Sequence, residues 1–256
     1  MAELWQEKYS PQTAEEFVGN SEILENALSW AGNWNKGQVQ APLLLWGQIG
    51  SGKTSLAYLI GKLSGWDVVE LNSSDLRSKD VIERVVGAAS QNASFFGSKR
   101  LILLDEVDAL TRNDRGGAAA ISAVIKDAKN PIILTANDIY ANKNVSALRF
   151  VCRTFEFKKI NYLSIAKHLR EILEKEGVEF DEDAIKELAK NSVGDMRSAL
   201  LDSQTLSFEG KISQEDVALL SPRERQQKVF AVMKAIFKGT NFADVREARS
   251  KSDLAN

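Results

Sequence analysis

A glycine-rich loop directly after an apolar run constrains this sequence more than any other feature. Residues 43–46 are four consecutive apolar side chains, typical of a buried strand, and Gly47 to Thr54 follow the pattern Gly-x-x-x-x-Gly-Lys-Thr. Such a loop turns several backbone N–H groups toward one anion, and the start of the following helix adds its positive dipole end. The alternative is an ordinary glycine-rich turn, but the strand before the loop and the helix after it favour a phosphate site.

Two side chains of the loop have expected chemical roles. We expect the Lys53 ammonium group to reach the β- and γ-phosphates of a nucleotide, and the Thr54 hydroxyl to coordinate Mg²⁺. The residues expected to bind the nucleotide at this loop are Gly47, Gln48, Ile49, Gly50, Ser51, Gly52, Lys53, Thr54 and Ser55.

A second apolar run ends in acidic residues. Residues 101–104 read as another buried strand, and Asp105 and Glu106 follow. In nucleotidases with such a loop, a carboxylate at the end of a strand holds Mg²⁺ together with the loop hydroxyl, which is the role expected for Asp105. Glu106 is placed to polarise a water molecule for attack on the γ-phosphate. The alternative is an exposed acidic turn.

A third strand, over residues 131–136, ends in the polar side chain of Asn137. Its amide is expected to hydrogen-bond the γ-phosphate or the attacking water. Asn is also an ordinary residue at the end of a strand, so this position carries little weight by itself.

Composition narrows the class of protein. The chain has 256 residues, 44% of them hydrophobic and 27% charged, which is typical of a globular protein with a sizeable core. The single cysteine, Cys152, allows no internal disulfide, and no apolar run approaches the roughly 20 residues that span a bilayer, so we expect an intracellular, cytoplasmic protein with no membrane partner. One histidine nearly excludes zinc sites and histidine-based triads, and His168 is expected on the polar side of its helix.

The order of patterns predicts the fold class. Five short strands, mostly apolar and separated by helices, indicate an α/β core with a five-stranded, mainly parallel sheet whose ligand lies at the carboxyl ends of the strands. Helical patterns over about 162–176, 181–190, 195–207 and 213–220 predict a small all-helical domain. The domains expected are a nucleotide-binding core over 1–159, a helical lid over 160–221 and the start of a further helical domain over 222–256.

Three further groups of residues have two interpretations each. Aromatic and apolar residues near Trp5, Tyr9 and Val18 either fold back over a nucleotide base or pack in the core. The basic side chains Arg77, Lys79 and Arg84 either contact backbone phosphates or form a solvated helix face. The adjacent Phe95 and Phe96 lie in a loop and need a pocket, which lies either in this chain or in a partner.

Taken together, these motifs resemble the Walker A, Walker B, sensor 1 and sensor 2 elements of an AAA+ ATPase, and the chain is similar to the large subunits of archaeal replication factor C, a clamp loader. The resemblance spans essentially the whole chain. It rests on Trp5, Lys8, Tyr9, Pro11, Val18-Gly19-Asn20, Gly47 to Thr54, Leu71-Asn72-Ser73-Ser74-Asp75, Arg77, Asp105-Glu106-Val107-Asp108, Asn137 and Gly194-Asp195-Met196-Arg197.

The resemblance implies roles for residues of the site. The cofactors would be ATP and Mg²⁺, with Asp105 organising the metal, Glu106 activating water, Asn137 sensing the γ-phosphate, and Arg197 coupling the lid to it. Tyr9, Pro11 and Val18 would line the adenine end, and Met196 would join Arg197 at the nucleotide.

One missing residue points to the large subunit within this family. Small subunits carry Ser-Arg-Cys before the fifth strand, and its arginine reaches into the neighbouring subunit's ATP site. Here the stretch reads Phe150-Val151-Cys152, so the chain should not donate that finger, although Arg149 or Arg153 could substitute for it.

The resemblance also implies partners: the small subunits of replication factor C, one large with four small, the sliding clamp (PCNA), and primer-template DNA at the archaeal nucleoid. Arg77, Lys79 and Arg84 would contact that DNA, and Phe95 and Phe96 would contact the clamp. The latter motif is degenerate, because Ala89 and Asn92 stand where glutamine and an aliphatic residue belong.

Two other readings stay open from the sequence. An AAA+ helicase loader or branch-migration motor would need a winged-helix domain or a complete finger arginine. A non-hydrolysing ATP-binding scaffold would not need Glu106. The family's large subunit continues through a helical collar domain, whereas this sequence ends just after that domain should begin, so we expect a truncated form rather than a naturally short protein.

Overall fold

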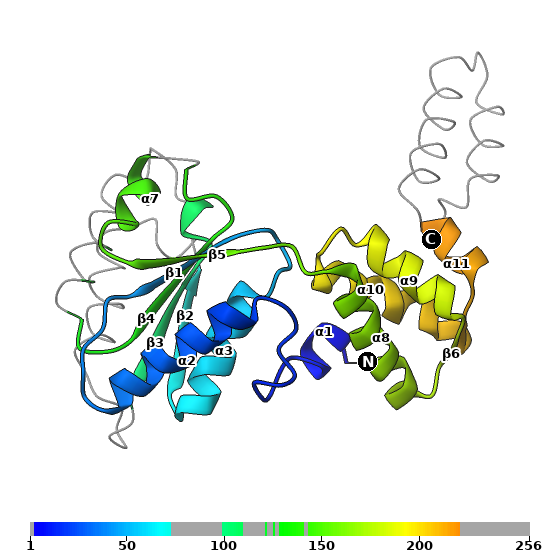
Figure 1. The fold of residues 1–256 in the computed structure, drawn as a ribbon, viewed down its shortest axis with the longest axis horizontal. Helices are drawn as coiled ribbons and strands as arrows, with labels where there is room; N and C mark the ends of the chain where they lie inside the picture. The colour runs from blue at the N-terminus through cyan, green and yellow to red at the C-terminus, as the bar shows by residue number, and fades with distance from the viewer. Residues whose placement is uncertain are drawn as a thin grey trace, which may run out of the picture.

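The computed structural model describes residues 3–72, 99–109, 121, 125, 128–140 and 143–220. Within these ranges the chain forms an α/β core and a helical lid, joined near residue 160 (Figure 1). None of the helices in the described part is long and apolar enough to cross a membrane.

A five-stranded parallel sheet forms the centre of the core. Its strands are β1 (Leu43–Gly47), β2 (Asp67–Asn72), β3 (Arg100–Asp105), β4 (Ile132–Ala136) and β5 (Arg153–Phe157). They lie in the order β2-β3-β4-β1-β5, and every pairing is parallel, which confirms the predicted fold class. The P-loop strand β1 is therefore flanked by β4 and β5, and β3 lies beyond β4.

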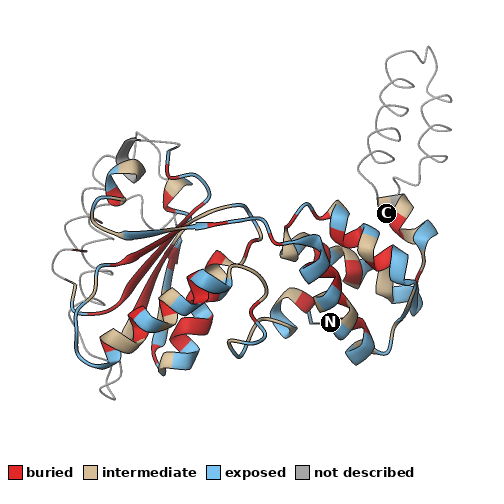
Figure 2. Ribbon diagram, in the orientation of Figure 1, coloured by how far each residue is buried: buried red, intermediate tan, exposed pale blue. Residues whose placement is uncertain are grey.

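The central strands are apolar along their whole length because both faces of the sheet are covered. Figure 2 shows these strands in red, the colour of buried residues. On one face α2 (Ser21–Asn35) and α3 (Lys53–Ser64) pack against side chains such as Leu43 and Leu45. On the other face Leu44 packs with Leu148 of α7 (Lys143–Leu148). This two-sided burial fixes the carboxyl ends of the strands, where the loops that carry function lie.

Four helices make up the lid. They are α8 (Tyr162–Glu176), α9 (Glu182–Asn191), α10 (Met196–Leu206) and α11 (Gln214–Leu220), close to the predicted spans. Their apolar stripes meet in one core that includes Ile165, Leu169, Ile185 and Leu188. A short 3₁₀ helix, η4 (Ser207–Glu209), follows α10.

The lid is not entirely helical, in contrast to the prediction. Two strands of two residues each, β6 (Glu179–Phe180) and β7 (Lys211–Ile212), pair in parallel. Strands this short have no periodicity that a sequence pattern can detect. They join the ends of α8 and η4 and so close the lid on the side away from the core.

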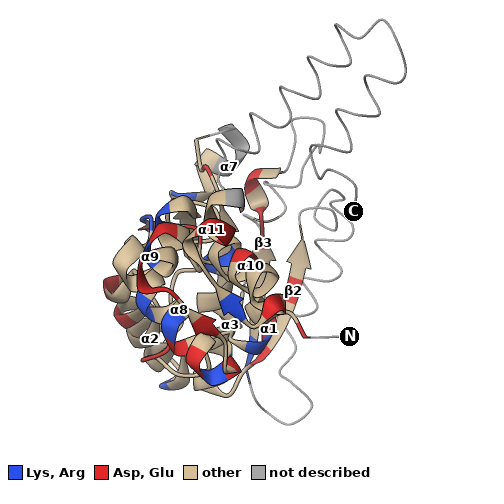
Figure 3. Ribbon diagram, turned by 90° about the vertical axis from the view of Figure 1, so that its right-hand side faces the viewer, with Lys and Arg blue, Asp and Glu red and all other residues tan. Residues whose placement is uncertain are grey.

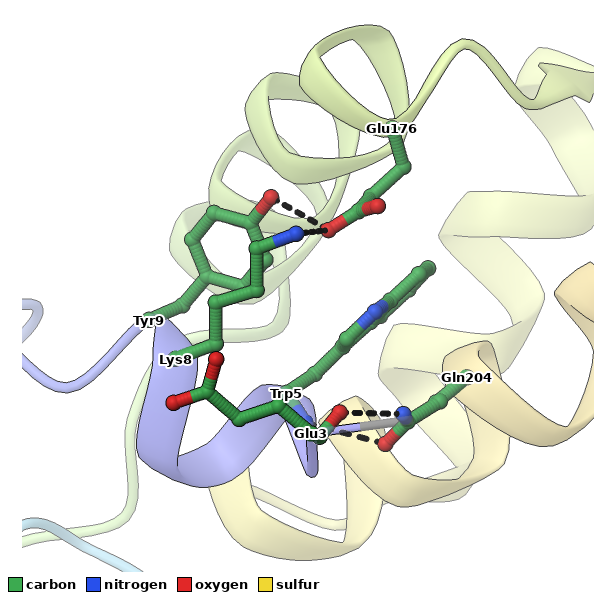
Figure 4. Close-up of polar contacts among 6 residues, drawn as sticks. All are labelled: Glu3, Trp5, Lys8, Tyr9, Glu176 and Gln204. Carbon is green, nitrogen blue, oxygen red and sulfur yellow. Dashed lines mark hydrogen bonds and ion pairs between the residues drawn. The ribbon is translucent and has the colours of Figure 1, made fainter. Parts of the chain in front are cut away.

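The N-terminal helix α1 (Trp5–Lys8) packs on the lid, although it precedes the core in sequence. Trp5 is 6% exposed and belongs to the lid's apolar core. Its backbone N–H donates to Gln204 Oε1 at 2.9 Å, and Gln204 Nε2 donates to the Glu3 carbonyl at 2.9 Å (Figure 4). Trp5 is thus a packing residue, and residues 10–20 cross from the lid back to the core.

The connection between core and lid is held by Asn20. Its side chain accepts from the Lys158 N–H at 3.0 Å and donates to the Lys158 carbonyl at 3.1 Å. Asn20 also occupies the N-cap position of α2 with a positive φ of 48°, but its side chain makes no capping bond. The residue at the N-cap position of α2 therefore fixes the linker between β5 and α8 instead of capping the helix.

Candidate nucleotide-binding site

The glycine-rich loop runs from the end of β1 to the start of α3 and requires glycine at several places. Gly47, Gly50 and Gly52 have φ angles of 126°, 65° and 98°, in the region that side chains disfavour. A Cβ on Gly47 would lie 2.4 Å from the Phe157 carbonyl oxygen of β5. The loop can therefore bend tightly beside β5 only because this position has no side chain.

Lys53 lies inside the loop with its ammonium group satisfied by protein oxygens. Its Nζ donates to the carbonyls of Gly47 and Gln48, each at 2.9 Å, and to Asn137 Oδ1 at 3.1 Å. The side chain is buried, and this burial lowers the pKa of Lys53, while the neighbouring carboxylates of Asp108 and Asp105 raise it. The same three acceptors hold the amine where an incoming phosphate would exchange with them.

Thr54 and Asp105 meet at the predicted metal position. Thr54 Oγ1 donates to Asp105 Oδ1 at 3.0 Å. Two oxygens that bind one Mg²⁺ at right angles lie about 2.9 Å apart, so this pair fits the ion. In the described chain, no group of three or more His, Cys, Asp or Glu side chains could hold a metal.

Thr135 connects the two acidic residues and was not predicted. It is buried in β4, its Oγ1 donates to Asp105 Oδ1 at 2.5 Å, and it accepts from the Glu106 N–H at 3.0 Å. Glu106 itself has a φ of 54°, which is uncommon outside glycine and marks a backbone held by its surroundings. A polar residue within the apolar run of β4 was the one signal of this role.

Asp108 orders the turn that carries Asn137. Its Oδ2 accepts from the N–H groups of Asn137 and Asp138, at 2.9 and 3.1 Å. Asp108 lies in the 3₁₀ helix η3 (Val107–Ala109), directly after the acidic end of β3. The last acidic residue of the Asp105 motif thus positions the predicted γ-phosphate sensor rather than the metal.

The lid reaches the loop directly through the start of α10. The Met196 N–H donates to the Gly50 carbonyl at 3.0 Å, and Asp195 caps the helix by accepting from the Ser198 N–H at 3.0 Å. A Cβ on Gly50 would lie 1.7 Å from Asp195 Oδ1. Arg197 lines the same cavity, close enough to Lys53 to lower the pKa of its amine.

The N-terminal segment forms the other end of the cavity with Tyr9, Pro11 and Val18. The Tyr9 hydroxyl donates to Glu176 Oε1 of α8 at 2.6 Å, and Lys8 Nζ bonds the same oxygen at 2.6 Å (Figure 4). These contacts fix the predicted base-side wall to the lid.

One cavity of about 440 Å³, within the range of small-molecule sites, connects the phosphate loop, the acidic motif, the lid and the N-terminal segment. Of the predicted loop residues, Ile49, Gly50, Gly52, Lys53, Thr54 and Ser55 line it. Gly47 and Gln48 contribute carbonyls to Lys53, and the fully buried Ser51 hydroxyl donates to the Gln48 carbonyl at 2.7 Å. Sequence reasoning missed further lining residues, among them Ser10, Phe17, Ile160 and Leu200.

His168 lies differently from the prediction. The apolar stripe of α8 is as expected, but His168 is half-buried and lines the cavity instead of facing solvent. The N-terminal segment covers that flank of the helix, which a pattern within α8 alone could not reveal.

The predicted contacts to DNA and clamp lie outside the described residues: Arg77, Lys79, Arg84, Phe95 and Phe96. On the described lid, basic and acidic residues intermix over α8 and α9 (Figure 3).

Arg149 and Arg153 are described, and both contact side chains of this chain. The Arg149 guanidinium lies 4.9 Å from the Phe150 ring, and Arg153 Nη2 donates to Asn26 Oδ1 at 2.6 Å.

Two family models match the chain in series. The model for the ATPase family associated with various cellular activities (AAA) matches residues 43–162, and the model for the DNA polymerase III clamp loader subunit, ATPase lid domain, matches residues 164–208. Among similar curated proteins, the replication factor C large subunit of Methanococcus maripaludis (strain C7) is 44% identical over 241 residues, 94% of this chain and 50% of that protein. The large subunit of Natronomonas pharaonis is 41% identical over 235 residues, 91% of this chain and 47% of that protein.

The chain belongs to the family of replication factor C large subunits, within the AAA ATPases. It spans about half the length of the curated members that it matches. Among solved structures, a RuvB variant from Thermotoga maritima has a TM-score of 0.65 and 18% identity, covering 95% of this chain and 88% of that one. At this identity the likeness supports the fold alone, whereas membership of the AAA family implies that the cavity binds a nucleotide.

Proposed function

We propose that this chain is the ATP-binding portion of a replication factor C large subunit that helps to open a sliding clamp and load it onto primer-template DNA. The observation that carries the proposal is the cavity between core and lid, whose phosphate loop is hydrogen-bonded to the lid through Gly50 and Met196. A ligand that fills this cavity contacts both parts, so binding and release of ATP change how they sit together. The sequence identity to large subunits supplies the clamp-loading context.

ATP binding is assigned to the residues of both ends of the cavity. The loop N–H groups and Lys53 hold the phosphates, and Thr54 and Asp105 hold Mg²⁺, which when bound neutralises phosphate charge. Tyr9, Pro11 and Val18 contact the base. Met196 and Arg197 contact the nucleotide from the side of the lid. The three protein oxygens now bonded to Lys53 release its amine when phosphate oxygens arrive.

Hydrolysis is assigned to Glu106 as the base that activates water, with Asn137 and Lys53 orienting the γ-phosphate. An arginine supplied by a neighbouring subunit is worth about 10³–10⁵ in turnover in this type of chemistry. We expect weak hydrolysis by this chain alone and full hydrolysis with a small subunit that provides the arginine. The DNA contacts of Arg77, Lys79 and Arg84, and the clamp contacts of Phe95 and Phe96, are part of the same proposal.

The test is ATP turnover by the chain alone and mixed with small subunits, with and without sliding clamp and primed DNA. We expect negligible turnover alone and clearly measurable turnover in the full mixture. Glu106→Gln should abolish turnover in the mixture and leave ATP binding intact, because the amide keeps the shape of the side chain but cannot accept the proton. Lys53→Ala is the control that should lose binding itself.

Three results would contradict the proposal in different ways. Unchanged turnover by Glu106→Gln would remove its assignment as the base. Turnover that appears with small subunits but does not change when sliding clamp and primed DNA are added would contradict the clamp-loading role. High turnover by the chain alone would favour a self-assembled AAA+ motor that carries its own finger arginine.

A further inference from the structure

His168 is the one histidine of the sequence, and no role in the proposed mechanism uses it. It lies on α8, half-buried, and it lines the nucleotide cavity together with Tyr9, Pro11 and Val18. It is therefore a lid side chain with hydrogen-bonding capacity on the wall of a site whose phosphate end is already fully assigned.

Electrostatics separate the two ends of the cavity. The charged neighbours that alter the pKa of Lys53 are Asp108, Asp105, Arg197 and Glu106. Those that alter the pKa of His168 are Glu171 and Lys175 on its own helix and Glu16 on the N-terminal segment. The two sets share no member, and the charged neighbours of His168 belong neither to the phosphate loop nor to the acidic motif.

Helix geometry places His168 on the same wall of the cavity as Tyr9. The Lys175 ammonium lies 6.0 Å from the centre of the Tyr9 ring. Lys175 is two turns beyond His168 on the same flank of α8, about 10 Å along the helix axis. Tyr9 and His168 thus border one stretch of the cavity, with Pro11 and Val18 facing it from the N-terminal segment.

We propose that His168 is a nucleotide-binding residue at the base end of the cavity, where its imidazole hydrogen-bonds the purine. The inference rests on the proposed function, since it assumes that the cavity holds ATP. A neutral imidazole has one donor and one acceptor, and the edge of a purine presents both kinds of group. With Arg197 near the phosphates, the lid then holds the nucleotide at both ends.

The protonation state follows from burial. Desolvation lowers the pKa of His168 below its ordinary 6.5, with Glu171 and Glu16 opposing the shift and Lys175 adding to it. The imidazole is therefore neutral at pH 7. A bound base removes more water from the ring, so ATP binding lowers this pKa further. By linkage, ATP affinity must fall as the pH drops through the lowered pKa of His168, because the unliganded chain then takes up a proton that the complex disfavours.

The test uses the single histidine of the tag-free 256-residue chain as its own probe. The imidazole resonances of His168 are followed by NMR during titration with ATP and, separately, with inorganic tripolyphosphate. We expect ATP to shift the resonances and lower the pKa of His168, and tripolyphosphate to bind at Lys53 without doing either. ATP that binds without moving these resonances would overturn the inference while leaving the proposed function standing.

Variants give a second, independent measurement. His168→Ala should weaken ATP binding about three- to tenfold, the loss of one hydrogen bond, and should leave tripolyphosphate binding unchanged. His168→Gln should recover part of the affinity, and its affinity should decline less at acidic pH than that of the unaltered chain. Lys167→Gln, at the exposed neighbouring position, is the matched control and should bind ATP normally. An equal loss of ATP and tripolyphosphate in His168→Ala would indicate a damaged lid, and failure of the unaltered chain to bind ATP would overturn both proposals.

Discussion

At the scale of single residues, Thr135 is the buried hydroxyl on which the acidic motif depends. Its hydroxyl donates to Asp105 Oδ1 at 2.5 Å, and the same hydroxyl oxygen accepts from the Glu106 N–H at 3.0 Å. We predict that Thr135→Val, which keeps the shape, lowers the free energy of unfolding by about 1–3 kcal/mol, because the Glu106 N–H loses its side-chain acceptor and the Asp105 carboxylate loses one of its two hydroxyl donors. Urea denaturation measures this change.

The same substitution should also affect turnover more than binding. Glu106 depends on Thr135 to hold its strained backbone, whereas Thr135 reaches the phosphate loop indirectly, through the Asp105 oxygen that also accepts from Thr54. We therefore expect a clear loss of turnover in the assembled complex and near-normal ATP affinity. Thr135→Ser retains the hydroxyl and is the control. If Thr135→Val matched the unaltered chain in both stability and turnover, Thr135 would have no positioning role.

The sequence predicts the positions of residues whose backbone angle or charge the site cannot do without. The glycines around Lys53 must adopt positive φ, and a lysine, a threonine and a strand-ending carboxylate at fixed spacing leave little choice of chemistry. Thr135 and His168 were not readable, because their surroundings come from other parts of the chain. Thr135 acts through β3, and His168 is covered by the N-terminal segment.

At the scale of elements, α1 is fastened to the lid by the Glu176 carboxylate, which bonds both Lys8 and Tyr9. We predict that Glu176→Ala weakens ATP binding about two- to fivefold, the effect of a partly exposed ion pair, because Tyr9 loses its fixed place at the base end. Calorimetric titration with ATP at pH 7 measures this. Glu174→Ala, an exposed position on α8, is the control, and equal affinity in the two variants would exclude a role for the bridge.

The pH dependence of this bridge has a definite sign. Hydrogen bonds from Lys8 and Tyr9 lower the pKa of Glu176 below its ordinary 4.5. A carboxyl group with a depressed folded-state pKa adds stability above its unfolded value and loses it as the pH falls through the folded value. The bridge should therefore be intact at pH 5 to 8, so a decline of ATP affinity in that interval does not come from the bridge.

Whole elements were predicted well where one face of the chain is buried along several residues. The parallel sheet and the four lid helices follow from long apolar runs and from helical periodicity. The pairing of β6 with β7, the docking of α1 on the lid and the use of Asn20 to hold Lys158 all depend on contacts between distant segments. Local patterns carry no information on such contacts.

At the scale of the whole molecule, the cavity belongs to neither part alone. The core supplies the phosphate loop and the lid supplies Met196, Arg197 and His168, while α1 and the segment after it bridge the two. A side chain at Gly50 would collide with the Asp195 carboxylate, and the Gly50 carbonyl accepts from the Met196 N–H, so the loop and the start of α10 are in direct contact. This contact is the route by which the contents of the cavity can set the position of the lid.

The residues around Val151 bear on whether this chain can supply an arginine finger to a neighbouring subunit. Val151 packs against the core, Arg149 stacks on Tyr140 and Phe150, and Arg153 bonds Asn26 beside the Phe155 ring. Both arginines are therefore engaged within this chain. We predict that Arg149→Ala and Arg153→Ala, alone or combined, leave turnover of the assembled complex within about twofold, whereas loss of a true finger costs about 10³–10⁵.

The matched control is alanine at the finger arginine of a small subunit in the same complex, which should show that large loss. Thermal unfolding of the Arg149 and Arg153 variants separates a damaged core from a lost function, because Arg153 also joins β5 to α2 through Asn26. A collapse of turnover in a variant that unfolds normally would mean that one of these arginines leaves its present partners to enter a neighbouring ATP site. The chain would then donate a finger despite Val151, and the absence of arginine at that position would no longer point to a large subunit.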